Sequence, residues 1–72
     1  MPRYRIEIKQ GASTQVVEVE CEGIENIRVE AVKLAQAFIN DLPVDFWEAP
    51  LWALRVTDES NMSILTLTLS GD

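Results

Sequence analysis

The stretch from Ile27 to Leu42 limits what this chain can fold into, because it has the length and periodicity of a helix. At about 100° per residue, its apolar side chains fall in one narrow stripe, with polar side chains opposite. Asn26 is a suitable N-cap, and Pro43 prevents continuation because it lacks a backbone N–H. The sequence therefore predicts one amphipathic helix with a single buried side, which consists of Ile27, Ala31, Leu34, Ala35, Phe38 and Leu42.

Four other runs alternate apolar and polar residues, which is the pattern of half-buried strands. They extend over Arg3–Lys9, Thr14–Cys21, Leu51–Thr57 and Met62–Ser70. Gly11 and the polar cluster 58–61 supply turns, so we expect one hairpin on each side of the helix. The side chains expected to face the core are Tyr4, Ile6, Ile8, Val17, Val19, Trp52, Leu54, Val56, Leu65, Leu67 and Leu69.

These elements predict a single α+β domain over residues 1–72, with a four-stranded sheet and one helix on one face. Two sheet orders fit the ββαββ pattern. In the order 2-1-4-3 the first and last strands lie parallel in the centre, whereas the order 2-1-3-4 is antiparallel throughout. The last run is the most continuously apolar, which suits a central strand. We therefore predict 2-1-4-3, a β-grasp-like order, with 2-1-3-4 as the alternative.

The charge of the chain argues against two classes of partner. Twelve carboxylates and six basic groups give a net charge of −6 and a pI near 4.4. This field repels phosphates and anionic lipid, so we expect neither nucleic acid nor a membrane as partner. Cys21 has no second cysteine to pair with, and the N-terminus has no apolar targeting segment. We therefore expect a cytoplasmic protein.

The residues that usually carry out catalysis are scarce. The sequence has no histidine, which is the commonest general base and metal ligand. Cys21 lies between Glu20 and Glu22, whose negative charges oppose thiolate formation, so we interpret it as a small buried apolar residue. Neither a phosphate-binding glycine loop nor the ligand spacing of a calcium loop is present. We expect no enzymatic activity, no metal and no cofactor.

Several apolar side chains are left without a place in the predicted core. Phe46 and Trp47 lie in the irregular segment 43–50, while Leu51 and Ile64 interrupt the polar outer face of the sheet. We predict these residues, Phe46, Trp47, Leu51 and Ile64, as partner-binding. Val32 and Ile39 lie on the flank of the helix stripe, where segment 43–50 or a partner covers them. Unpaired strand edges offer another route to association.

The function best supported by these features is a non-enzymatic protein-binding or self-associating module. Its partner is a second copy of the chain, since so short a chain is only marginally stable alone, or another protein. The alternative is an acidic inhibitor or nucleic-acid mimic that docks a basic partner through the carboxylates clustered between Glu18 and Glu30. Salt distinguishes the two, because mimicry weakens steeply with ionic strength.

Two resemblances accompany this interpretation. The opening Met1-Pro2-Arg3-Tyr4, the glycines Gly11 and Gly23, Glu30-Ala31 with Ala35, and Val56-Thr57-Asp58-Glu59 resemble a family of short uncharacterised bacterial proteins. That family has no assigned activity, so the resemblance implies none. The segments 24–28 and 65–69 are similar, more weakly, to ubiquitin-like β-grasp proteins. This chain ends Ser70-Gly71-Asp72 rather than Gly-Gly, so conjugation and sulfur transfer are not implied.

Overall fold

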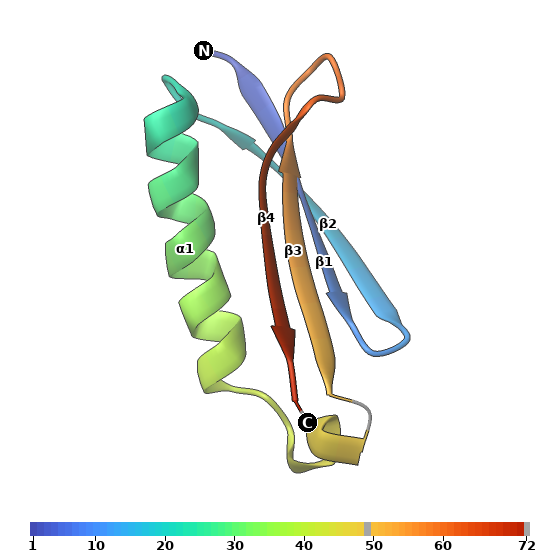
Figure 1. Cartoon of the computed structure of the whole chain (residues 1–72). Helices are drawn as coiled ribbons and strands as arrows, with labels where there is room; N and C mark the ends of the chain where they lie inside the picture. Colours follow the sequence, from blue (N-terminus) through green and yellow to red (C-terminus); the bar gives the residue numbers. More distant parts are fainter. Residues whose placement is uncertain (49, 72) are drawn as a thin grey trace.

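The structure is a computed structural model that describes residues 1–48 and 50–71; Ala49 of the predicted loop and the terminal Asp72 lie outside this part. A hairpin of β1 (Arg3–Gln10) and β2 (Ser13–Glu20) precedes helix α1 (Ile24–Asn40). A short 3₁₀ helix, η1 (Val44–Glu48), leads to a second hairpin of β3 (Leu51–Thr57) and β4 (Ser63–Ser70). Figure 1 shows α1 lying along one side of the sheet. The predicted ββαββ order and the α+β class are confirmed.

The strand order is β2-β1-β3-β4, and all three pairings are antiparallel. The alternative order 2-1-3-4 is therefore correct, and the preferred order 2-1-4-3 is wrong. The first and last strands are not neighbours, so the β-grasp resemblance does not extend to the topology. The edges of the sheet are β2 and β4, whereas the preferred order placed β2 and β3 at the edges.

The burial of β3 explains why this strand occupies the centre. Trp52, Leu54 and Val56 are each at most 1% exposed, which requires a neighbouring strand on both sides and a helix above. The pairing of β1 with β3 also places Glu7 opposite Arg55, a favourable cross-strand pair. The apolar run of β4 misled the prediction, because its leucines occupy one face and its threonines are exposed on the other.

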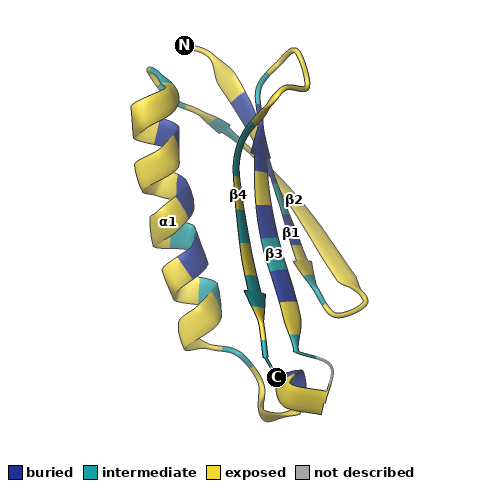
Figure 2. Ribbon diagram, viewed as in Figure 1, coloured by how far each residue is buried: buried dark blue, intermediate teal, exposed yellow. Residues whose placement is uncertain are grey.

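Helix α1 connects two strands that run in the same direction, β2 and β3, with β1 between them. This crossover places α1 over the inner face of the sheet, as in a split βαβ unit. Ala31 and Ala35 are buried at the contact, and their small side chains allow the helix to approach the strands closely. Figure 2 shows the buried residues on the facing sides of α1 and the sheet. The core consists of Tyr4, Ile6, Ile8, Ile27, Ala31, Ala35, Phe46, Trp52, Leu54 and Val56.

The helix lies two to three residues earlier than predicted at both ends. It begins at Ile24 with Gly23 as N-cap, so the prediction of Asn26 as N-cap is wrong. Its last residue is Asn40, after which the backbone N–H of Asp41 donates to the carbonyl of Phe38 and that of Leu42 donates to the carbonyl of Ile39. Leu42 lies outside the helix because a residue that precedes proline disfavours the helical conformation. Leu42 still packs against the core from this position.

Strand β2 is the least buried element of the sheet, as Figure 2 shows. Val17 was predicted to be a core residue, but it is 40% exposed. The closest contacts of α1 with the sheet are with β3 and β4, and an open groove lies between the C-terminal half of α1 and the β1–β2 hairpin. Val19 is half-buried and contacts the core.

Candidate functional site

The free edge of β4 presents unpaired backbone groups to solvent. The N–H of Gly71 donates to the carbonyl of Pro50 at 3.2 Å. The odd-numbered residues near this end of β4 therefore direct their backbone N–H and C=O groups toward β3. In an antiparallel ladder the intervening residues face the other way. Thr66, Thr68 and Ser70 therefore direct their N–H and C=O groups away from the sheet. Residues 63–70 include neither a charged residue nor a proline, so nothing in the strand blocks pairing with another strand.

The opposite edge, β2, is protected by charge. The N–H of Cys21 donates to the carbonyl of Pro2 at 3.1 Å, which by the same alternation directs the backbone of Val16 and Glu18 outward. Glu18 and Glu20 stand along this edge, and the Arg3 guanidinium lies 3.6 Å and 3.2 Å from their carboxylates. Charged side chains on an edge strand discourage pairing. The two edges therefore differ in their capacity to accept a strand.

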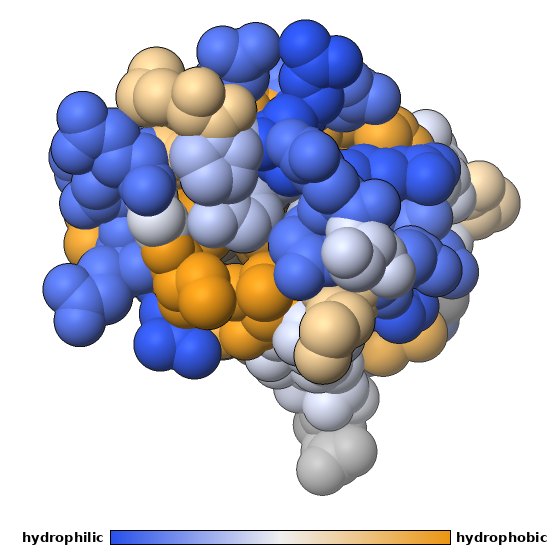
Figure 3. Space-filling view, turned by 90° about the horizontal axis from the view of Figure 1, so that it is seen from above, coloured by the Kyte–Doolittle hydropathy of each residue, from blue (hydrophilic) through white to orange (hydrophobic). Residues whose placement is uncertain are grey.

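One flank of α1 adds apolar surface beside β4. Ile24, Val32 and Ile39 are 45%, 42% and 41% exposed and lie within about 80° of one another on the helix. The opposite flank of α1 carries Ala37 and Asp41 and faces the β1–β2 hairpin. The flank with the three exposed apolar residues therefore faces the β4 side. We call these three residues the helix flank. Figure 3 looks onto one end of the molecule from above and shows an apolar patch bordered by polar side chains.

Helix η1 separates the two aromatic residues that were predicted to bind a partner. Phe46 is 6% exposed and belongs to the core, so its side chain is not on the surface of the domain. The 3₁₀ turn directs it inward, and its ring meets Trp47 edge-on at a centroid distance of 5.2 Å. Trp47 is 63% exposed. Segment 43–50 leaves Val32 and Ile39 open to solvent rather than covering them.

Trp47 is placed at the end of β4 by a close contact with glycine. A Cβ atom on Gly71 would lie 2.9 Å from Cζ3 of Trp47, which shows that the indole rests against this residue. The exposed aromatic ring is therefore next to the last residues of the free edge. We call β4, the helix flank and Trp47 together the apolar edge surface.

The remaining two predicted partner-binding residues lie in different environments. Leu51 is 58% exposed at the start of β3. Ile64 is half-buried and packs against the core instead of lying on the outer face. The register between β3 and β4 shifts near Val56 and Thr57, and the extra residue in β4 interrupts the alternation of faces. The sequence gives no sign of this bulge.

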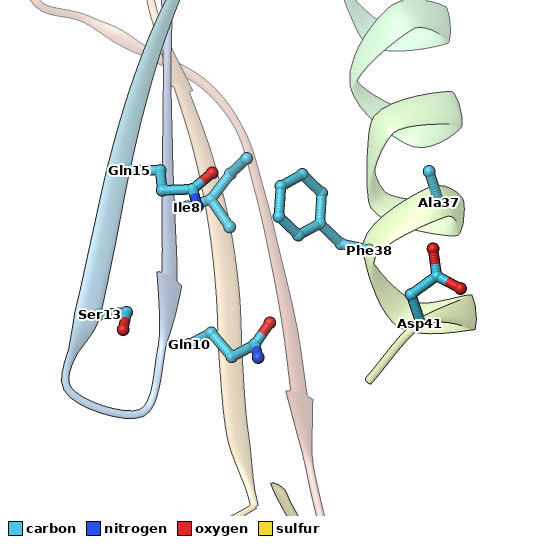
Figure 4. A pocket seen from close by; sticks show the side chains of 7 residues that line it. All are labelled: Ile8, Gln10, Ser13, Gln15, Ala37, Phe38 and Asp41. Carbon is cyan, nitrogen blue, oxygen red and sulfur yellow. The ribbon is translucent and has the colours of Figure 1, made fainter. Parts of the chain in front are cut away.

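A second feature is an open groove of about 410 Å³ between the C-terminal half of α1 and the β1–β2 hairpin. Figure 4 shows Phe38 pointing from α1 toward the strands, with Ile8 and Gln15 on the far wall. Gln10 and Ser13 add polar groups lower on the hairpin side. Asp41 is the single ionisable side chain among the described residues that line the groove.

The charged residues at the opposite end of the sheet hold the chain together. The N–H of Arg3 donates to Oε1 of Glu59 at 2.9 Å, which ties the N-terminus to the β3–β4 turn. Oδ1 of Asp58 accepts from the N–H groups of Ser60 and Met62, both at 2.9 Å. The described residues contain no group of three or more histidine, cysteine or carboxylate side chains arranged to hold a metal ion.

Comparison with known proteins identifies the family. Residues 3–70 match a domain of unknown function, DUF6894. The chain belongs to this family. The match confirms the predicted membership of an uncharacterised family, and with it a function not yet established; the DUF6894 match begins after Met1-Pro2, so this opening stays outside it. No curated protein and no solved structure matches the chain. Among the described residues of this DUF6894 domain, no helix is long and apolar enough to cross a membrane.

Proposed function

We propose that this domain is a non-enzymatic protein-binding module that accepts an uncharged, extended strand along β4. The observation that carries the proposal is the combination of an unprotected edge in β4 with an exposed apolar helix flank beside it. Strand addition uses the free backbone groups of Thr66, Thr68 and Ser70 for affinity. Apolar side chains of the incoming strand then cover the half-buried leucines of β4 and the helix flank.

The chemistry of this surface suits binding rather than catalysis. Its side chains are apolar or carry hydroxyl groups, and none is an acid, a base or a thiol. We therefore propose that the domain acts without a cofactor. We place it in the cytoplasm, because the unpaired Cys21 fits a reducing compartment better than a secreted one.

Mimicry of nucleic acid is less well supported by the geometry. Two of the clustered carboxylates, Glu18 and Glu20, lie beside the Arg3 guanidinium, which neutralises part of their charge. A basic partner has to displace this arginine before it can use them. An apolar strand partner meets no such competition at β4.

The proposed function is tested with a synthetic peptide that copies residues 63–70 and carries uncharged glycine–serine extensions at both ends for solubility. Its binding to dilute domain is followed by fluorescence anisotropy. Thr66→Pro removes an N–H that faces the free edge and leaves the β3–β4 ladder intact, as proline at an edge allows. We expect it to weaken peptide binding about tenfold, since one to two hydrogen bonds are lost.

The matched control is Val16→Pro, which removes an edge-facing N–H from β2 instead. We expect it to bind the peptide as tightly as the unmodified domain. Equal losses in the two variants, or no loss in Thr66→Pro, contradict strand addition at β4. Peptide binding that disappears at high salt supports a charge-driven interaction and therefore favours the acidic-mimic alternative.

A further inference from the structure

We infer that the strand bound by β4 is β4 of a second copy, so that two domains form one continuous antiparallel sheet. This inference rests on the proposed function and specifies its partner. The first argument is charge. A chain with a net charge of −6 repels its own copy, and β4 is the strand without a charged residue. The carboxylates of β2 are on the far edge.

The second argument is that β4 is complementary to itself. Antiparallel pairing about a two-fold axis through Leu67 places Leu67 opposite its own copy and Leu65 opposite Leu69 of the copy. It also places Thr66 opposite Thr68 of the copy, where the two residues exchange backbone hydrogen bonds. Leucine then meets leucine on the inner face and threonine meets threonine on the outer face, both favourable cross-strand pairs.

Neighbouring registers are less complementary. With the axis through Thr66, Leu69 lies opposite Ser63 of the copy. With the axis through Thr68, Leu65 lies opposite Gly71 of the copy, which offers no side chain to contact. The axis through Leu67 is therefore the register in which every inward leucine of β4 has an apolar partner.

The third argument is the position of α1. The strands that come closest to α1 are β3 and β4. A helix midway between these two strands lies about one strand spacing, ~4.8 Å, from the proposed axis. The two helices are then ~10 Å apart, which is the distance of directly packed helices. An antiparallel copy then places the helix flank of one domain beside the helix flank of the other.

The position of α1 along the length of β4 agrees with a two-fold axis through Leu67. Phe38 contacts Trp52 at a centroid distance of 6.4 Å, and Trp52 is opposite Leu69. Leu67 lies ~7 Å further along β4, which corresponds to about four residues of helix. Leu34 is therefore level with the axis, and Val32 lies within one turn of it. The residues that α1 leaves exposed are thus the ones that a copy covers.

Sedimentation equilibrium tests whether the domain is a dimer. We expect a dimer that does not weaken between low and high salt, because no ion pair is involved and salt screens the repulsion between the two acidic copies. Thr66→Pro is expected to shift the population to monomer, and Val16→Pro is not. Val32→Lys weakens the dimer through the helix flank, whereas Ala37→Lys on the other flank leaves it unchanged.

Cysteine cross-linking tests the register in a Cys21→Ser background. Mixed Thr66→Cys and Thr68→Cys chains are expected to form a disulfide between the two variants, since the Cα atoms of such pairs lie ~5.5 Å apart. A disulfide in Thr66→Cys or Thr68→Cys alone overturns the Leu67 axis in favour of its neighbours. A monomer that still binds the β4 peptide overturns the inference and leaves the proposed function standing. A monomer that does not bind the peptide removes both.

Discussion

The backbone angle φ determines whether two glycines of this domain tolerate substitution. Gly11 has a φ of +59° in the two-residue turn between β1 and β2, a conformation that costs other residues free energy. Gly23 has a φ of −174°, which is extended backbone that any residue adopts. A Cβ atom meets no neighbour at either position. The two glycines therefore differ in backbone conformation, while both have room for a side chain.

We expect Gly11→Ala to lower the free energy of unfolding by about 1–2 kcal/mol, because alanine is strained at positive φ. Gly23→Ala serves as the control and is expected to change it by less than about 0.5 kcal/mol. Urea denaturation followed by circular dichroism measures both. If the two variants lose the same stability, conformational strain in the hairpin turn is not the cause.

At the scale of elements, η1 places one aromatic residue in the core and its neighbour on the proposed binding surface. Phe46 points into the core and Trp47 lies outside against Gly71, although the two residues are adjacent in sequence. A 3₁₀ helix rotates successive side chains by about 120°, so neighbours reach different environments. The segment thus closes one end of the core and exposes an aromatic side chain beside the free strand.

We expect Phe46→Ala to destabilise the fold by about 3 kcal/mol, because it leaves a cavity in the core. Trp47→Ala is expected to cost under about 1 kcal/mol in the folded monomer and to weaken β4 association several-fold. Chemical denaturation and the peptide-binding assay separate these effects. A large loss of stability in Trp47→Ala at concentrations where the domain is monomeric contradicts a binding role for this residue.

The elements that the sequence predicted well are those with strong local periodicity. The stripe of α1 and the alternation of β1 and β3 placed Ile27, Ile6 and Leu54 correctly in the core. The helix start was wrong, because Asn26 is also compatible with a first turn and Gly23 has no capping side chain. Strand order and the position of Ile64 depend on pairing between distant segments and on a bulge, which periodicity does not encode.

The candidate surface was predicted in part for the same reason. Trp47 and Leu51 were identified because they are apolar residues without a periodic place, and both are exposed. The free edge of β4 was missed because the preferred order made this strand central. Exposed threonines alternating with leucines were the available signal, since a strand buried on both sides is typically apolar throughout.

At the scale of the whole molecule, the helix covers one side of a sheet that is wider than itself. The closest contacts of α1 are with β3 and β4, while Val17 on the inner face of β2 is exposed. A chain of this length buries only about 60% of its unfolded surface, so its stability is limited while the helix flank and β4 remain in water. Pairing through β4 enlarges the buried core without adding residues.

We therefore expect the thermal unfolding midpoint to rise with protein concentration, because association stabilises the folded state by mass action. Thr66→Pro is expected to unfold at the same temperature at every concentration, and Val16→Pro to follow the unmodified domain. Differential scanning fluorimetry over a hundredfold range of concentration measures this. A midpoint that does not depend on concentration in the unmodified domain contradicts association.

The charged β2 edge has one more consequence. When two domains join through β4, both outer borders of the combined sheet are β2 strands that carry Glu18 and Glu20. A third chain meets repulsion at either border, so addition ends after a single step. The assembly is a closed pair and does not grow into a fibre, even though its joining strand has the alternating apolar pattern of segments that polymerise.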